Sequence, residues 1–203
     1  HGETTTDSEG QFTVRFTAIP DKKIDRKLEP VFDYRIYTDI TDRNGETRSG
    51  QNLVSAGYKS LLLNVYTPER IATDALKNIQ VWATNMNGER QAAMVTLSIV
   101  KLAPEQRLIR DRYWPQPDQF VMSKEEYIRY FPYDEYSNES NRTAWAKGET
   151  VYTQTDSTRI NSEWSLSGAN LKPGYYQLEF TTRDKEGQEV KDIRYVEVFD
   201  NNS

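Results

Sequence analysis

Aromatic and acidic side chains gather in one stretch of the sequence whose residue types suit carbohydrate chemistry. The aromatic members are Tyr127, Tyr130, Phe131, Tyr133 and Tyr136, and the acids are Glu125, Glu126, Asp134 and Glu135. One hypothesis is a glycan-binding shelf, because aromatic faces stack on sugar rings and carboxylates bind hydroxyls. A second is a carboxylate pair for glycoside hydrolysis, which requires two carboxyl groups facing across a cleft. A third, which we favour, is an insertion that its aromatic side chains pin to a β-sandwich while its acids stay in water.

The rest of the sequence lacks residues that most enzyme and metal sites need. There is no cysteine, which excludes disulfides, thiolate zinc sites and cysteine nucleophiles. The one histidine is His1, at the terminus, so a triad with an internal histidine is excluded too. We therefore predict that the chain is not an enzyme, that it uses no cofactor, and that no residue is catalytic, cofactor-binding or metal-ligating.

Charge and hydropathy exclude two further classes of function. The 26 basic and 31 acidic residues give a net charge of −5, and both signs are mixed along the chain. A nucleic-acid-binding protein would show a clustered basic patch, and none is present. The apolar runs, such as Leu61 to Leu63 and the longest one, Ala92 to Val95, are far too short to span a bilayer. We expect no nucleic-acid partner and no direct membrane insertion by this chain.

A local turn pattern recurs four times along the chain. It begins with Asp or Asn, continues with two polar residues and Gly, and ends with Glu or Gln, at 7–11, 42–46, 85–89 and 184–188. The first side chain accepts bonds from backbone N–H groups two residues on, and the glycine takes the positive φ that closes a hairpin. Calcium loops would need acids at alternate positions and a distal glutamate, which these segments lack.

The flanks of these turns alternate apolar and polar residues, which is typical of antiparallel sheet with one wet face. Examples are Phe12, Val14, Phe16 and Ala18; Phe32, Tyr34, Ile36 and Ile40; Ile79, Val81 and Ala83; Ala93, Val95, Leu97 and Ile99; Tyr176, Leu178 and Phe180; and Val196 and Val198. The predicted strands lie near 3–6, 11–18, 31–41, 47–56, 60–67, 77–85, 91–101, 149–155, 161–167, 174–183 and 189–199. The fold class is therefore all-β, with tandem immunoglobulin-like antiparallel sandwiches.

The strands divide into two predicted domains. Residues 1–57 form the C-terminal part of a first sandwich, and residues 58–203 form a complete second sandwich. The alternative, with seven strands in 1–102 and four after, is left open by counting alone. The second domain carries an insertion at 103–148, which includes the one predicted helix. Ser123 and Glu126 form a capping box, and the helix runs from Lys124 to Phe131, where Pro132 stops it.

The four tryptophans all lie in the second domain. Trp82 and Trp164 fall within predicted strands, so we expect them to pack in the core or at its rim. Trp114 lies in the insertion beside prolines, and the sequence leaves open whether it anchors the insertion or contacts a partner.

Several segments resemble bacterial α2-macroglobulin-like proteins, whose macroglobulin domains are immunoglobulin-like sandwiches. They are Gly2 to Asp21, Asp39 to Gly50 continuing into Gly57-Tyr-Lys-Ser-Leu, Met122-Ser-Lys-Glu-Glu-Tyr-Ile-Arg-Tyr-Phe-Pro, and the closing Leu171-Lys-Pro-Gly-Tyr-Tyr-Gln-Leu-Glu-Phe. The third segment is similar to the large versions found in Bacteroidetes.

The resemblance implies a fragment of a many-domain protein, often lipid-anchored in the periplasm or at the cell surface, that traps or inhibits proteases. The family's internal thioester needs a Cys-Gly-Glu-Gln motif, which a chain without cysteine lacks. We place no bait region in it, so the fragment is expected to be scaffold. Its expected partners are neighbouring domains of the parent protein and, through that protein, host or competitor proteases. The alternative is a glycan-binding or adhesin-type module of a surface protein.

Overall fold

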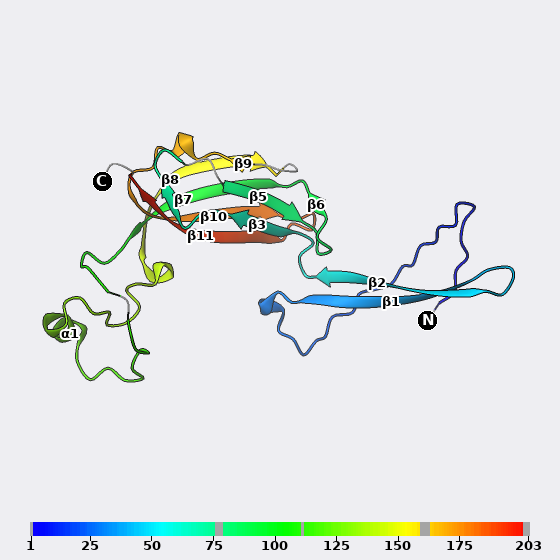
Figure 1. Ribbon diagram of the computed structural model, residues 1–203, viewed down its shortest axis with the longest axis horizontal. Helices are drawn as coiled ribbons and strands as arrows, with labels where there is room; N and C mark the ends of the chain where they lie inside the picture. Colours follow the sequence, from blue (N-terminus) through cyan, green and yellow to red (C-terminus); the bar gives the residue numbers. More distant parts are fainter. Residues whose placement is uncertain (1, 76–78, 111, 159–162, 201–203) are drawn as a thin grey trace. The chain divides into compact units, whose positions relative to one another are not determined.

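The computed structural model describes residues 2–75, 79–110, 112–158 and 163–200. The chain forms two compact units that divide between Ser60 and Leu61. We call them the N-terminal unit and the C-terminal unit, and Figure 1 labels their elements. Within the described residues, no helix is long and apolar enough to cross a membrane.

The N-terminal unit is built on one long β-hairpin. Strand β1 (Val31–Thr41) pairs antiparallel with β2 (Thr47–Gly57), in a register that runs from Val31 opposite Gly57 to Thr41 opposite Thr47. The turn forms as predicted, because Asp42 Oδ1 accepts from the N–H groups of Asn44 and Glu46 at 2.8 and 2.9 Å. A short 3-10 helix, η1 (Arg26–Leu28), precedes the hairpin.

The strands predicted near 3–6 and 11–18 do not form. The turn between them does: Asp7 Oδ1 accepts from the N–H groups of Glu9 and Gln11 at 2.9 and 2.8 Å. Its flanks, however, pair with no other strand, and β1 and β2 make up a sheet of two strands only. An alternating pattern suits a segment to a β-sheet, but a strand forms only where a neighbouring strand supplies the backbone hydrogen bonds.

The N-terminal unit consequently buries very little of its surface. None of its described residues is buried, and the side chains on the apolar side of β1 are at most half-buried. One segment that covers this side is residues 16–19, where the ring of Phe16 lies 5.6 Å from that of Tyr34 and the Tyr34 hydroxyl donates to the carbonyl of Ile19. The described residues of this unit are thus a partly covered hairpin, and the predicted partial sandwich is not seen in them.

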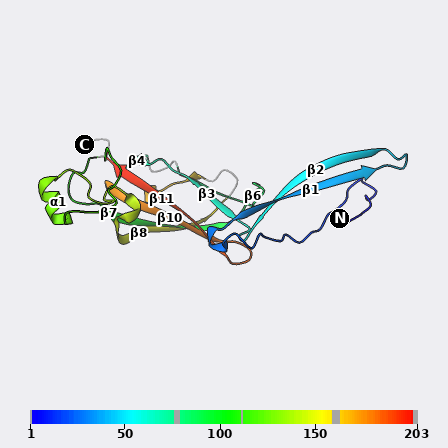
Figure 2. The ribbon, with the colours of Figure 1, turned by 90° about the horizontal axis from the view of Figure 1, so that it is seen from below.

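The C-terminal unit is a two-sheet β-sandwich (Figures 1 and 2). One sheet has the order β4-β11-β10-β7-β8, and the other has the order β3-β5-β6 with β9 also paired to β5. The strands are β3 (Leu62–Tyr66), β4 (Arg70–Ala72), β5 (Ile79–Thr84), β6 (Arg90–Gln91), β7 (Met94–Ala103), β8 (Ala146–Ser157), β9 (Glu163–Trp164), β10 (Gly174–Arg183) and β11 (Glu189–Phe199). Short 3-10 helices are η2 (Arg142–Ala144) and η3 (Ser167–Ala169).

The strand pairing settles how the strands are grouped. Strand β7 lies between β8 and β10, so the strand predicted at 91–101 belongs with the later strands, and the alternative division after residue 102 is wrong. The pairs are antiparallel except for β4 and β11, which run parallel where Arg70 lies opposite Glu197. The predicted strand 161–167 is observed as β9 only, and residues 161 and 162 lie outside the described residues.

The core lies between the two sheets, and the predicted alternation places it correctly. Fully enclosed side chains come from both sheets, and include Ile79, Val81, Leu97, Ile99, Leu178 and Phe180. Trp164 is 2% exposed and packs edge-on against Phe180 with ring centroids 6.1 Å apart, which confirms its predicted core position. Trp82 is half-buried at the rim, where the guanidinium of Arg90 lies over its ring.

A buried tyrosine fixes the start of β10. Tyr176 is 3% exposed, and its hydroxyl donates a 2.8 Å hydrogen bond to the backbone carbonyl of Lys172. Between them Gly174 adopts φ 151°, a region that favours glycine. Burial raises the pKa of the Tyr176 hydroxyl above its ordinary value.

Candidate functional site

The insertion between β7 and β8 carries the candidate site. We use the name insertion for residues 104–145, of which all but residue 111 are described. Its one α-helix, α1 (Lys124–Tyr130), ends one residue before the predicted end. The Ser123 hydroxyl oxygen accepts from the N–H of Glu126 at 3.2 Å, which is the predicted N-cap. The N–H of Phe131 closes the last turn on the carbonyl of Tyr127 at 2.8 Å.

Three arginines tie the two arms of the insertion together. Arg107 Nη1 donates to the carbonyls of Pro132 and Asp134 at 3.1 and 2.8 Å. Arg112 Nη2 donates in the same way to the carbonyls of Glu135 and Ser137, at 3.1 and 2.7 Å. An arginine that bridges two carbonyls crosslinks a loop with no sheet ladder, because its rigid fork of donors fits both acceptors at once.

Arg110 lies between these two arginines and makes a different contact. Its Nε donates to Asp134 Oδ1 at 2.5 Å, while the backbone N–H of Arg110 donates to the carbonyl of Tyr133. The Asp134 carboxylate raises the pKa of Arg110 above its ordinary value. The Arg110 side chain is 62% exposed, whereas that of Arg112 is 13% exposed, so the two arginines differ greatly in their exposure to solvent.

A buried carboxylate joins helix α1 to this network. Glu139 Oε2 accepts from the N–H of Ser137 at 2.7 Å, and Glu139 Oε1 lies 3.3 Å from Lys124 Nζ and 3.6 Å from Arg107 Nη2. Burial alone would raise the pKa of Glu139, but the backbone hydrogen bonds and Lys124 outweigh burial, and the pKa lies below its ordinary value. The pKa of Lys124 is raised, chiefly by its hydrogen bond to Glu105.

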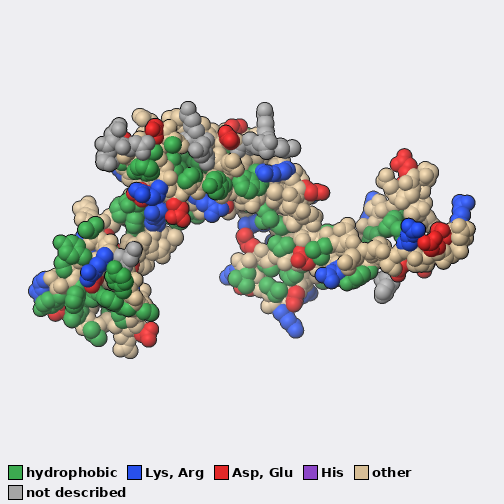
Figure 3. Space-filling model, in the orientation of Figure 1, with side chains coloured by type: hydrophobic (Ala, Val, Ile, Leu, Met, Phe, Trp, Pro, Cys, Tyr) green, Lys and Arg blue, Asp and Glu red, His purple; other side chains and the backbone are tan. Residues whose placement is uncertain are grey.

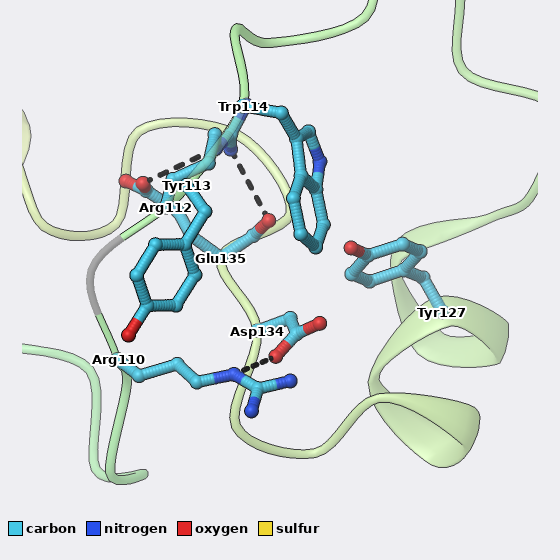
Figure 4. Close-up of a pocket in the computed structure, with 7 residues that line it drawn as sticks. All are labelled: Arg110, Arg112, Tyr113, Trp114, Tyr127, Asp134 and Glu135. Atoms are coloured by element: carbon cyan, nitrogen blue, oxygen red, sulfur yellow. Dashed lines mark hydrogen bonds and ion pairs between the residues drawn. The ribbon is translucent and has the colours of Figure 1, made fainter.

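A small hollow lies beside the arginines (Figure 4). Its lining residues are Arg110, Arg112, Tyr113, Trp114, Tyr127, Asp134 and Glu135. The cavity volume is about 10 Å³, roughly what one water molecule requires. Two carboxylates suggested by the sequence do meet here, but Asp134 is paired with Arg110 and Glu135 with Arg112. Within the described residues, no group of three or more His, Cys, Asp or Glu could hold a metal ion.

The aromatic residues of the insertion pack mainly on one another. The ring of Tyr127 lies 5.0 Å from that of Phe131 and 5.4 Å from that of Tyr136, and Tyr136 also contacts Phe120 at 4.4 Å. None of these ring pairs includes a residue of a sandwich strand, and the prediction that the rings pin the insertion to the sandwich stays a prediction for them. The residue that does contact a sandwich strand is Trp145, whose ring meets that of Tyr175 at 4.9 Å.

Sequence reasoning placed helix α1 correctly but missed the arginine network. The prediction that the acids stay in water is wrong for Asp134, which is buried, and for Glu135, whose side chain is 9% exposed. Arg107, Arg110 and Arg112 follow one another at short intervals in a segment with no secondary structure. Several closely spaced arginines beside a later acidic stretch are a signal for an ion-paired loop. Of the four acids singled out in the sequence, Asp134 and Glu135 join the network, while Glu125 and Glu126 remain exposed on α1.

Comparison with known proteins assigns no family to the chain. No protein-family model matches it. No curated protein matches it at a significant level.

Proposed function

We propose that this chain is a non-catalytic scaffold segment of a larger α2-macroglobulin-like protein, which traps or inhibits proteases at the bacterial cell envelope. The observation that carries the proposal is the architecture of the C-terminal unit together with its buried Tyr176. The sequence resemblance to bacterial macroglobulin domains supplies the family and, with it, the location in the periplasm or at the cell surface.

The strand order supports an immunoglobulin-like sandwich. The run β11-β10-β7-β8 corresponds to the G-F-C-C′ order of variable-type domains, and β3, β5 and β9 correspond to A, B and E. The insertion then lies between strands C and C′. The parallel pair β4–β11 and the very short β9 are departures from the simplest version of this topology.

The bond from Tyr176 to Lys172 supports the same assignment. Immunoglobulin-like sandwiches carry a tyrosine corner near the start of strand F, whose hydroxyl bonds to the backbone a few residues upstream. Tyr176 occupies that position on β10 and makes that bond at 2.8 Å. In antibody domains a cysteine lies two residues further on, and here Leu178 fills that place as a fully buried apolar residue.

A scaffold role agrees with the chemistry of the insertion. The hydrolase alternative needs a carboxyl group available to give a proton, and Asp134 and Glu135 are each engaged by an arginine. The N-terminal unit is compatible with the proposal as part of a macroglobulin-like sandwich, because a two-stranded hairpin without a buried residue is marginally stable by itself and gains from further strands over its apolar side.

The proposal is tested on the intact parent protein. After incubation with a broad-specificity protease, we expect the protease to co-migrate with the parent and to keep its activity on small peptides while losing it on large proteins. If neither a complex nor protection of large substrates is observed, the parent is not a protease trap.

Glycan binding is the second candidate, and the exposure of the insertion's rings favours it. Tyr130 and Tyr133 are 59% and 57% exposed, so much of each ring is accessible to a ligand. Among the ring pairs of the insertion, however, planes are tilted by 32° to 57°, so these pairs do not form a flat shelf. This candidate predicts binding to a polysaccharide that is lost in Tyr130→Ala or Trp114→Ala.

A further inference from the structure

The insertion reverses the usual distribution of side chains between inside and outside. Among its described residues, the buried ones are Asp134 and Glu139, both charged, and no hydrophobic residue is buried. Charged residues are rarely buried unless they are paired, and here they hold the loop together. The apolar side chains are left facing solvent, which is unfavourable for an isolated loop and typical of an interaction site.

Six large side chains make up what we call the insertion apolar surface. They are Leu108, Tyr113, Trp114, Val121, Tyr130 and Tyr133, with exposures from 54% for Trp114 to 91% for Val121. In the space-filling view, hydrophobic side chains gather over the region of α1 (Figure 3). Tyr and Trp are the residues most enriched in the energetically dominant positions of protein interfaces.

The charges of the insertion are not balanced, because most of its basic groups pair with a carboxylate whereas several of its acids do not. Arg107, Arg110, Arg112, Lys124 and Arg142 each lie within ion-pair distance of a carboxylate. Arg129 stacks over the ring of Tyr130 at 5.1 Å. By contrast, Asp118, Glu125 and Glu126 are exposed and have no basic partner in the part of the chain that the structure describes.

In the described part of the insertion, three exposed acids without a basic partner therefore stand against one base without a carboxylate partner, Arg129, and this excess of acidic charge selects the partner. A second copy of the chain would bring Glu125 and Glu126 against the same acids, and like charges across an interface are strongly disfavoured. A partner with basic groups around an apolar centre would match both features. We propose that the insertion apolar surface docks a protein segment in which apolar side chains alternate with lysine or arginine.

A carbohydrate fits these observations less well than such a segment. The hollow beside Trp114 has room for about one water molecule, at a volume of about 10 Å³. The polar groups that would bind hydroxyls, on Asp134 and Glu135, are held by arginines. The docking surface is also independent of the macroglobulin assignment, since it rests on exposure and charge within the insertion alone.

The test uses the whole chain and a labelled amphipathic peptide of leucine and lysine, with fluorescence anisotropy at low ionic strength as the readout. The same peptide with glutamate in place of lysine is the charge control. We expect the leucine–lysine peptide to bind at least about tenfold more tightly than the leucine–glutamate peptide. Val121→Ser and Tyr130→Ser should each weaken binding about tenfold, because they remove exposed apolar surface without adding charge.

Matched variants on the sandwich distinguish binding at the insertion apolar surface from nonspecific peptide binding. Tyr66, in β3, is 59% exposed like Tyr130, so Tyr66→Ser should leave peptide binding unchanged. Glu125→Lys with Glu126→Lys should weaken binding, whereas Glu149→Lys, an exposed change in β8, should not. Because all of these side chains are exposed, we expect the variants to fold, and circular dichroism checks that they do.

Four results would overturn the proposal. The first is no binding of the leucine–lysine peptide, and the second is equal binding of both peptides. The third is displacement of the bound peptide by the polysaccharide laminarin, with loss of laminarin binding in Trp114→Ala, which would make the surface a glycan site. The fourth is self-association of the free chain that Val121→Ser abolishes, which would make a second copy the occupant. None of these results involves a protease, so failure here is distinct from failure of the trap.

Discussion

The hydroxyl of Tyr176 donates a 2.8 Å hydrogen bond to the backbone carbonyl of Lys172 and so closes the corner that leads into β10. The bond is made inside the protein, since Tyr176 is 3% exposed. It joins the central strand of the larger sheet to the segment that crosses from the other sheet. The corner therefore contributes to the stability of the C-terminal unit directly.

Replacing Tyr176 by phenylalanine should destabilise the C-terminal unit by roughly 1–2 kcal/mol, because the ring stays in place while the Lys172 carbonyl loses its donor. Urea unfolding followed by circular dichroism measures the change. Tyr175→Phe is the matched control, since the adjacent Tyr175 ring packs on Trp145 and no hydrogen bond of its hydroxyl is seen in the described residues. Equal losses in both variants would mean that the corner bond has no special role.

The pH dependence of the insertion should follow Glu139. Its pKa in the folded chain lies below the ordinary 4.5. The folded state therefore favours the ionised form, and the contribution of Glu139 to stability is present above pH 4.5 and is lost as the pH falls through the lowered pKa. Amide exchange at Ser137 should accelerate over that range, and Glu139→Gln should remove this pH dependence. A profile that is unchanged in Glu139→Gln would contradict the assignment.

The two arginines of Figure 4, Arg110 and Arg112, should differ in their importance for the loop. Arg112→Ala removes two hydrogen bonds from a side chain that is 13% exposed, so roughly 2–3 kcal/mol of local stability should be lost. Arg110→Ala removes one ion pair, between an arginine that is 62% exposed and the buried Asp134, so we expect a smaller loss. Limited proteolysis of the insertion measures the difference, and the opposite order of sensitivity would show that Arg110 holds the loop.

Among the strands, β1 and β2 should have the lowest protection against amide hydrogen exchange. Its described neighbours include no buried residue, whereas β10 contributes several residues that are almost fully enclosed. Local opening is easiest where few apolar contacts are lost, so hydrogen exchange should be much faster in β1 and β2 than in β10. Protection of β1 as strong as that of β10 would mean that the N-terminal unit has a core of its own.

Most turns and strands of the sandwich could be predicted because turn residues and apolar–polar alternation determine the structure of their own segment. The turn at 184–188 forms as expected, with Asp184 Oδ1 accepting from the N–H groups of Glu186 and Gln188, and alternation along β10 identified the buried face. The strand predicted at 11–18 failed because pairing depends on a distant neighbour that the pattern does not reveal. The buried Tyr176 has a local signal in the sequence, namely the run from Leu171 through Pro173 and Gly174 to Tyr176.

The candidate site was harder to predict than the fold. Which of Tyr127, Tyr130 and Tyr133 is exposed depends on how the two arms of the insertion pack, and residue type does not decide that. The pairing of Arg112 with Glu135 joins positions in two irregular segments, where no helical or strand period relates them. The sequence therefore indicates a group of acids in the insertion, but it does not indicate that Asp134 and Glu135 pair with arginines.

The most direct test of the scaffold role compares two variants of the full-length parent in the protease-trapping assay. Leu178→Ala opens a cavity in the sandwich core, at a cost of about 2–5 kcal/mol, whereas Glu135→Gln changes the carboxylate that a catalytic role would need. We predict that Leu178→Ala reduces the protection of large substrates while Glu135→Gln leaves it intact. Loss of protection in Glu135→Gln, with full protection in Leu178→Ala, would contradict a non-catalytic scaffold.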